Sequence, residues 1–185
     1  MIRRLGAAFA LVLLSLPALA ETVPEPVGFR MEEYGAPVPA TLAGARVVST
    51  EGAELLWREG NATFVDVLPL MPKPELPEGT VWQEEQRFDI PGSIWLPDVG
   101  YGALTPEMEA WYRDSIEAIA AGDTSRTLVI YCKADCWMSW NAAKRAVSWG
   151  FSGIVWYPDG TDGWEAAKLP LEERQPEPRP GEVSD

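Results

Sequence analysis

Short runs of β-forming residues alternate along the chain with helical patterns, and this alternation predicts an α/β fold. The expected strands lie at residues 45–49, 64–68, 93–97, 128–131 and 153–157. Helical patterns follow Thr50 and Thr105, each of which is a candidate N-cap, and others begin at Trp137 and at Trp164. A turn-rich loop is expected at residues 158–163, before the last of these helices. Because strands that alternate with helices form parallel sheets, we expect three layers, with a central, mainly parallel sheet flanked by helices.

The clearest helix signal begins at Thr105, an N-cap residue that is followed by Pro106 at the first helical position. Acidic residues follow at the positive end of this helix, and Gly122 lies beyond its last turn. Apolar side chains recur on one face at helical spacing, and we interpret them as core: Met108, Trp111, Tyr112 and Ile119.

Proline-rich segments mark the parts of the chain where we expect no helix or central strand. Residues 21–45 are expected to form an extended arm, and residues 69–89 a long loop that is a candidate lid over the cysteines. Residues 172–185 are expected to be a disordered acidic tail, which leaves 46–171 as a single domain. Asp66 interrupts a buried strand, and we expect it to cap the following loop rather than to act in catalysis.

Residues 1–20 have the layout of a secretory signal peptide, with Arg3 and Arg4 before an apolar run that ends at Ala18-Leu19-Ala20. Cleavage would give a periplasmic protein without stable membrane insertion, because no later apolar run is long enough for a bilayer span. The formal net charge of −13 argues against nucleic acid, anionic lipid and highly charged anionic ligands, and favours basic partners. The same charge also has a plainer interpretation, the solubility of an exported protein.

The chain contains two cysteines and no histidine, and both cysteines lie within residues 128–141. The lack of histidine excludes histidine-ligated haem, histidine-bearing zinc sites and catalysis by Ser-His-Asp or Cys-His groups. Cys132 follows a strand and precedes a helix, where free backbone N–H groups and the helix dipole favour a thiolate. A nucleophilic or redox cysteine is therefore expected there.

Three residues separate Cys132 from Cys136, and two cysteines of an exported chain are expected to pair with each other. On a regular helix their Cβ atoms would lie about 6 Å apart, whereas a disulfide needs about 3.8 Å, so the bridge requires a curled loop. Three interpretations remain open. They are a structural disulfide, a reversible pair with Cys132 as nucleophile and Cys136 as resolving thiol, and a copper(I) site of Cys132, Cys136 and Met138.

Four segments resemble the ordered motifs of a rhodanese domain: FVDV at 64–67, IPGSI at 90–94, LVIYC at 128–132 and WEAAKLPL at 164–171. More narrowly, residues 135–141 and 160–164, with the arm around Tyr34, are similar to the exported CXXCW-motif proteins. That group is associated with pyrroloquinoline-quinone-dependent alcohol catabolism. Its name implies two residues between the cysteines, whereas this chain has three.

The rhodanese resemblance implies a sulfurtransferase loop, in which Cys132 carries a persulfide held by backbone N–H groups. Rhodanese loops have the form Cys-x-x-Gly-x-Arg, but here Asp135 replaces the glycine and Trp137 the arginine. At about 6 Å and an effective dielectric near 20, each charge change disfavours an anionic donor by roughly 2–3 kcal/mol. Lys133 offsets part of this, and aspartate still permits a left-handed backbone. Sulfur transfer from thiosulfate is therefore less favoured than thiol redox chemistry at these cysteines.

A further interpretation of this stretch is an aromatic slot for a planar cofactor at Trp137 and Trp140. Pyrroloquinoline quinone is polyanionic and would need a local basic pocket in so acidic a protein. The basic residues near the cysteines are Lys133, Lys144 and Arg145.

The narrower resemblance implies an accessory role in a periplasmic oxidation system, with a quinoprotein dehydrogenase or a cytochrome c as partner. We predict thiol redox or accessory chemistry in pyrroloquinoline-quinone-dependent alcohol oxidation. The alternative is a non-enzymatic binding module or chaperone for a quinoprotein, a cytochrome or copper(I). The predicted site comprises Cys132 and Cys136, with Lys133, Asp135, Trp137 and Trp140 as binding residues.

Overall fold

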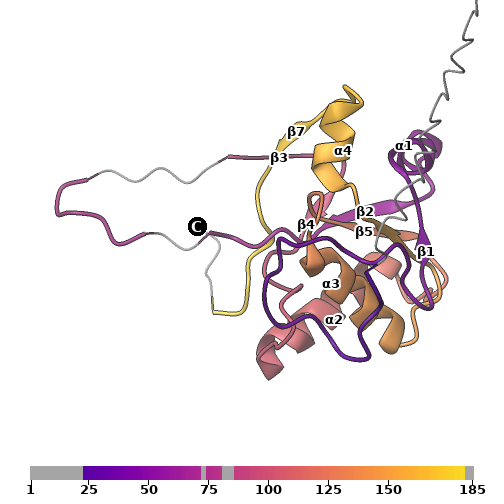
Figure 1. Ribbon diagram of the computed structural model, residues 1–185, viewed down its shortest axis with the longest axis horizontal. Coiled ribbons are helices and arrows are strands. Elements are labelled where there is room, and N and C mark those ends of the chain that lie inside the picture. The colour runs from indigo at the N-terminus through magenta and orange to yellow at the C-terminus, as the bar shows by residue number, and fades with distance from the viewer. Residues whose placement is uncertain (1–22, 72–73, 81–85, 182–185) are drawn as a thin grey trace, which may run out of the picture.

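The computed structural model describes residues 23–71, 74–80 and 86–181, and within them a five-stranded parallel sheet forms the centre of an α/β fold (Figure 1). The strand order is β1-β6-β5-β2-β4, and every neighbouring pair is parallel. The strands are β1 (Arg46–Val47), β2 (Thr63–Asp66), β4 (Ile94–Trp95), β5 (Leu128–Tyr131) and β6 (Ile154–Tyr157). The predicted mainly parallel α/β sheet is confirmed, whereas the predicted signal peptide lies outside the described residues.

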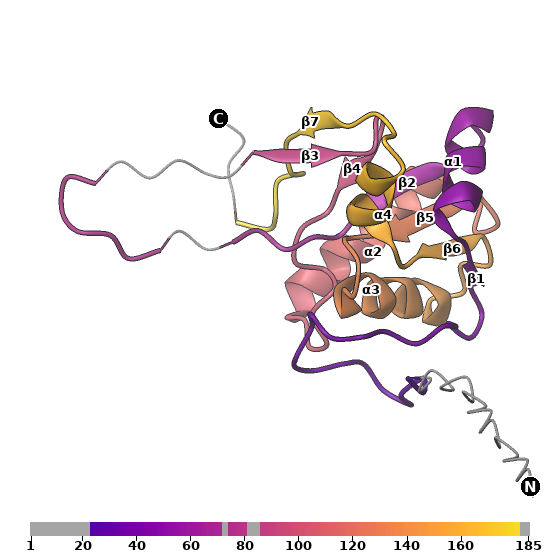
Figure 2. The same cartoon turned by 45° about the horizontal axis from the view of Figure 1, so that its top comes forward.

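Helices cover both faces of the sheet, which gives the described part of the chain three layers (Figure 2). They are α1 (Thr50–Glu59), α2 (Pro106–Ala120), α3 (Trp137–Ser148) and α4 (Gly160–Ala166). On one face, α2 and α3 bury Tyr112, Ile116 and Trp140, and on the other, α1 and α4 bury Leu56 and Trp164. Because β5 and β6 are covered on both faces, both of their alternating sets of side chains are apolar or aromatic.

α2 begins and ends as its sequence signals predict. The Thr105 hydroxyl accepts a hydrogen bond from the Met108 N–H at 3.3 Å, and Pro106 is the first helical residue. Gly122, just beyond the helix, has a φ of 80°, a left-handed conformation that glycine adopts without strain. Tyr112 is fully buried on the predicted core face.

The C-terminal segment differs from the predicted disordered tail. Residues Glu172–Arg174 form β7, which pairs antiparallel with β3 (Arg87–Asp89) in a separate two-stranded sheet. Farther along, the Glu177 N–H donates to the Trp95 carbonyl at 2.9 Å, at the edge strand β4. The segment is ordered because it satisfies backbone groups on exposed strand edges, which composition alone does not reveal.

The start of α1 and the start of α4 also differ from prediction, and the two differences have one cause. Ser49, not Thr50, is the N-cap of α1, and its hydroxyl accepts from the Gly52 N–H at 3.4 Å. The Thr50 hydroxyl instead donates to Asp159 at 3.1 Å, just before α4. α4 already begins at Gly160, where the sequence predicted a turn. This contact fixes α4 beside α1 and above the end of β5.

The long loop between β2 and β3 extends away from the sheet in both views (Figures 1 and 2). Its described residues, 67–71, 74–80 and 86, carry no helix or strand, as predicted, but the last three residues of the predicted loop, Arg87–Asp89, form strand β3. Its role as a lid stays a prediction. Within the described segments of the chain, no helix is long and apolar enough to cross a membrane.

The arm at residues 23–45 contains no helix or strand and runs along α3 (Figure 2). The Arg30 N–H donates to the Asn141 side chain at 2.9 Å, and the Asn141 amide donates back to the Arg30 carbonyl at 2.8 Å. The Lys144 ammonium donates to the Pro26 carbonyl at 2.7 Å. The arm is therefore extended, as predicted, and is held by backbone hydrogen bonds from α3 side chains.

Candidate functional site

Cys132 and Cys136 are joined by a disulfide in the loop between β5 and α3. Their Cα atoms lie 6.3 Å apart, within the range that a disulfide spans, so the curled loop that the spacing required is present. The loop turns at Asp135, which has a φ of 51° where the rhodanese resemblance expects glycine. The prediction that aspartate keeps a left-handed conformation at this position is confirmed.

The N-terminus of α4 holds one side of the cysteine loop. The Thr161 N–H donates to the Cys132 carbonyl at 3.0 Å, and the Ala134 N–H donates to the Asp162 carboxylate at 3.1 Å. Gly160 permits this approach, because a side-chain carbon there would overlap the Cys132 carbonyl. A backbone donor of the loop is thus bound to a carboxylate of the protein itself, where an external anion would otherwise bind.

The arm holds the other side of the loop, at the first turn of α3. The Trp137 N–H donates to the Tyr34 carbonyl at 2.9 Å, and the Trp137 indole N–H donates to the Pro37 carbonyl at 3.2 Å. The first N–H groups of a helix lack partners within the helix and are the usual donors to a bound anion. Here one of these N–H groups, that of Trp137, is bound to the Tyr34 carbonyl of the arm.

The two tryptophans predicted to bind a planar cofactor are covered by the arm. Trp137 is 2% exposed and Trp140 is fully buried, and their rings meet edge to face with centroids 5.4 Å apart. Of the basic residues predicted to surround the slot, Lys144 binds arm carbonyls and Arg145 binds backbone carbonyls that follow β4. The predicted aromatic slot is therefore wrong, because these side chains are used in packing the arm and α3.

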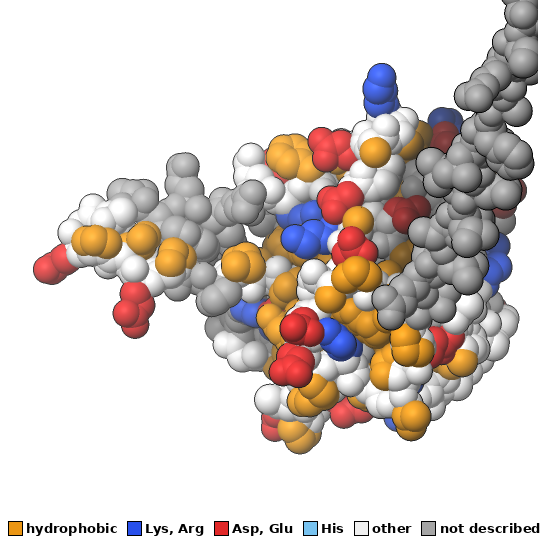
Figure 3. Space-filling view, viewed as in Figure 1, with side chains coloured by type: hydrophobic (Ala, Val, Ile, Leu, Met, Phe, Trp, Pro, Cys, Tyr) orange, Lys and Arg blue, Asp and Glu red, His pale blue; other side chains and the backbone are white. Residues whose placement is uncertain are grey.

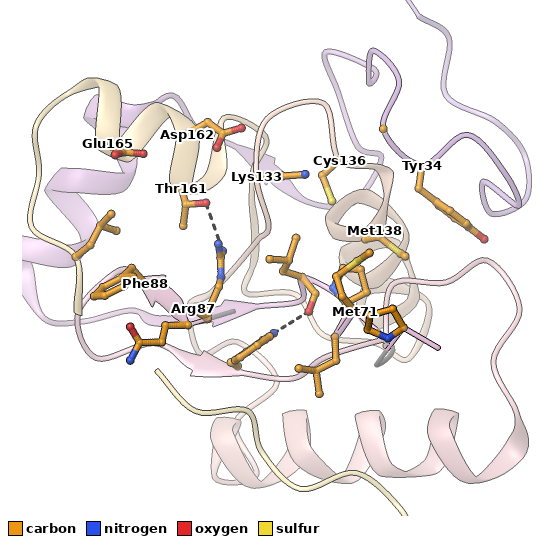
Figure 4. A pocket seen from close by; sticks show the side chains of 18 residues that line it. Tyr34, Met71, Arg87, Phe88, Lys133, Cys136, Met138, Thr161, Asp162 and Glu165 are labelled. Atoms are coloured by element: carbon orange, nitrogen blue, oxygen red, sulfur yellow. Dashed lines mark hydrogen bonds between the residues drawn. The ribbon is translucent and has the colours of Figure 1, made fainter. Parts of the chain in front are cut away.

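An open cavity of about 1130 Å³ lies beside the disulfide, and Cys136 is the cysteine on its wall (Figure 4). Cys136 is 5% exposed, whereas Cys132 is fully buried. Lys133 also lies on the wall, while Asp135 is exposed to solvent away from it. The structure therefore places Cys136 on the cavity wall, where the sequence led us to expect Cys132.

A buried ionic cluster beside the cavity was not anticipated from the sequence. The Arg87 guanidinium donates to Asp66 at 2.8 Å and lies 3.8 Å from Asp89, and both carboxylates are fully buried. Arg87 also donates to the Thr161 hydroxyl at 3.3 Å, which links the cluster to α4 and the cysteine loop. The Tyr131 hydroxyl donates to Asp89. Two carboxylates thus share one cation immediately behind the cavity wall.

Burial determines the charge states in this cluster. Burial, reinforced by the charge of Asp89, raises the pKa of Asp66 well above its ordinary value, against the opposing effect of Arg87. Burial disfavours the charge on Arg87, but the two carboxylates outweigh it and raise its pKa. Burial and the same carboxylates raise the pKa of Tyr131, so its hydroxyl remains a donor. Asp66 also accepts from the Leu68 N–H at 2.9 Å, which confirms its predicted loop-capping role.

A sequence signal for this cluster exists. Arg87 and Asp89 come directly before the IPGSI segment and alternate with Phe88, as two inward polar side chains of a strand would. Among the described residues, no group of three or more cysteine or carboxylate side chains is arranged to hold a metal ion.

Comparison with known proteins gives structural neighbours but no family. No protein-family profile matches the chain, and no curated protein sequence matches it. An uncharacterised protein from Saccharomyces cerevisiae is 24% identical over 69% of this chain and 98% of that one, with a TM-score of 0.40. A Rhodopseudomonas palustris protein of unknown function, described as a possible tyrosine phosphatase, is 19% identical over 70% and 86%, with a TM-score of 0.45. An EanB variant in complex with hercynine is 22% identical over 78% and 35%, with a TM-score of 0.48.

Proposed function

We propose that this chain is a periplasmic, rhodanese-like thiol–disulfide exchange protein that serves pyrroloquinoline-quinone-dependent alcohol oxidation. The observation that carries the exchange chemistry is the position of the disulfide, at the carboxyl end of β5 with Cys136 on the wall of an open cavity. Ligands of parallel sheets bind at this end of the strands. The link to alcohol oxidation rests on the CXXCW resemblance.

The exchange begins when a thiolate of a partner dithiol attacks the Cys136 sulfur. A bond forms between the partner sulfur and Cys136, the Cys132–Cys136 bond breaks, and the electron pair leaves on Cys132. The partner's second thiolate then attacks the partner's first sulfur, which is bonded to Cys136 in the mixed disulfide. This step forms the partner's disulfide and releases Cys136 as a thiolate. The partner dithiol loses two electrons and two protons, and the two cysteines of this protein gain them. The reverse sequence reduces a partner disulfide.

The charges around the cavity favour neutral or cationic thiols. Asp162 and Glu165 lie on its wall with Lys133, and Figure 3 shows acidic side chains gathered around α4. Arg87 also reaches the wall, but the buried carboxylates behind it offset its charge. The loop N–H groups that would attract an anion are bound to Asp162 and the Tyr34 carbonyl. A protein or peptide thiol with neutral or basic neighbours is therefore the expected substrate class.

We expect the disulfide to be reduced fastest by cysteamine, more slowly by 2-mercaptoethanol and slowest by 3-mercaptopropionate, when rates are compared per thiolate. One unit of charge about 8 Å from the acidic wall, at an effective dielectric near 40, is worth about 1 kcal/mol or about fivefold in rate. Alkylation and intact mass follow the loss of the disulfide. Glu165→Gln should reduce the preference, whereas Glu117→Gln on the far helix α2 should not. Equal rates for the three thiolates would refute the substrate class.

Catalytic turnover separates this function from a non-enzymatic binding module. A small amount of the protein should accelerate transfer of oxidising equivalents from hydroxyethyl disulfide to a reduced dithiol peptide over many turnovers. The double variant Cys132→Ser/Cys136→Ser is the matched control and should be inactive. Reduction of the protein without any turnover would instead assign the disulfide a structural role and support the binding module or chaperone.

Sulfur transfer from thiosulfate to cyanide is expected to be negligible. Cys132 is buried, and two loop N–H groups that would stabilise an anionic adduct are already bound to a carboxylate and a carbonyl. Thiocyanate formation by the reduced protein measures this activity. Turnover that Cys132→Ser abolishes would contradict the proposal and favour a sulfurtransferase.

A further inference from the structure

The sulfur atoms of the described chain concentrate at the cavity. Cys136, Met138 and Met71 lie on its wall, and Cys132 lies directly behind Cys136 in the disulfide. Figure 4 shows Cys136, Met138 and Met71 at the same end of the cavity. Met138 belongs to the first turn of α3 and Met71 to the long loop after β2, so segments far apart in sequence each contribute a thioether to the lining of one cavity.

We propose that opening the disulfide creates a copper(I) site whose ligands are the thiolates of Cys132 and Cys136 and the thioethers of Met138 and Met71. A partner dithiol supplies the two electrons and becomes a disulfide, and copper(I) then displaces the two cysteine protons without changing its own oxidation state. Copper(I) is a soft ion that prefers thiolate and thioether sulfur. The chain has no histidine to offer instead.

The surroundings of the sulfurs favour this ion over harder metals. Zinc takes four ligands from thiolate, nitrogen and carboxylate groups. This set offers zinc only two such ligands, the two thiolates, because the other two are thioethers. Asp162 and Glu165 lie at the cavity wall, where their negative charge attracts a cation. Among the described residues, they do not form a group of three or more cysteines or carboxylates that could hold a metal ion. The oxidised protein offers no thiolate, so binding depends on the redox state of the loop.

The two thioethers have different roles in this site. Met138 is 3% exposed, and its backbone is packed so closely on Gly100 that any side chain at that glycine would overlap it. Met71 is 74% exposed at the mouth of the cavity. Met138 is therefore a fixed ligand next to Cys136, and Met71 is the ligand on the solvent side of the ion.

Anaerobic competition with bicinchoninate, a coloured copper(I) chelator, tests the proposal on the reduced full-length protein. We expect one copper(I) per chain, and none for the oxidised protein. Met138→Leu should weaken binding by at least about tenfold, in the range found when groups that support a metal site are removed. Met71→Leu should have a smaller effect, and Met108→Leu on α2 is the matched control and should have none.

Binding that is unaffected by Met138→Leu, or reduced protein that takes no copper from the chelator, would overturn the inference. The proposal uses the same cysteines as the exchange function but fails separately from it. Disulfide exchange without copper binding would remove only the copper site. Methionine-dependent copper binding by chemically reduced protein, without any exchange activity, would retain the site and remove the exchange function.

Discussion

Cys132→Ser is expected to leave a protein that forms a stable mixed disulfide through Cys136, whereas Cys136→Ser is expected to leave a nearly unreactive thiol at Cys132. The reason is access to the sulfur. Cys136 lies on the cavity wall, while Cys132 is fully buried in the core on the face of the sheet that α2 and α3 cover. The thiolate that attacks or is attacked must reach the other sulfur directly, so accessibility determines the order of reaction.

The size of the difference follows from the contacts that hold the loop closed. The N–H groups of Ala134, Trp137 and Thr161 each make a hydrogen bond that must break before Cys132 reaches solvent. At about 1 kcal/mol net for each bond, opening costs about 3 kcal/mol, which corresponds to a reactivity about a hundredfold lower. This order is the opposite of the one that the strand-to-helix junction alone suggests.

Limited alkylation of the reduced proteins, followed by peptide mass analysis, measures the order. Dithionitrobenzoate offers a second reading, because the Cys132→Ser variant should retain one thionitrobenzoate group and release it only on reduction. Unfolded protein in denaturant is the control, since both thiols should then react alike. Faster labelling of Cys132 than of Cys136 in the folded protein would show that the loop opens readily and would restore Cys132 as the nucleophile. In periplasmic extracts, the same variant tests whether a quinoprotein dehydrogenase or a cytochrome c is the trapped partner.

Local signals in the sequence were sufficient to predict the elements that carry the cysteines. The apolar run of β5 is continuous because the strand is covered on both faces, and the cysteine loop follows it directly. The left-handed turn at Asp135 and the pairing of the cysteines followed from residue type and from spacing. Each of these features depends on residues that lie close together in the chain, which is the range over which such patterns are informative.

The parts of the site that were missed depend on contacts between segments far apart in the chain. Arg30 and Tyr34 bind α3 more than 100 residues later in the sequence, and no periodic pattern in the arm indicates this. Arg87 meets Asp66 across the long loop, and Thr161 meets Cys132 across a strand and a helix. The sequence therefore predicted the disulfide and the loop that carries it, but not which sulfur the surrounding segments leave on the cavity wall.

Arg87→Met is expected to be the most destabilising single substitution proposed here, with a loss of about 3–5 kcal/mol in the free energy of unfolding at pH 7. The substitution leaves Asp66 and Asp89 buried without the cation that lies 2.8 Å and 3.8 Å from them. For a domain of this size, such a loss lowers the Tm by about 6–20 °C. Arg113→Met is the matched control, because the exposed pair of Arg113 with Glu117 should contribute no more than about 1 kcal/mol.

The loss caused by Arg87→Met should shrink as the pH falls, and the direction follows from the pKa of Asp66. Burial holds that pKa above its ordinary value of 3.8, so the folded state binds the proton more tightly than the unfolded state and is stabilised by acidification toward 3.8. Without Arg87, which lowers this pKa, the stabilisation on acidification is larger. Denaturant unfolding of wild type and Arg87→Met between pH 7 and about 4.5 measures how the difference in their free energies of unfolding shrinks.

The double variant Arg87→Met/Asp66→Asn should recover part of the stability at pH 7 and show a weaker pH dependence. A gap between wild type and Arg87→Met that stays constant with pH would mean that Asp66 does not take up the proton, and that the loss arises from packing alone.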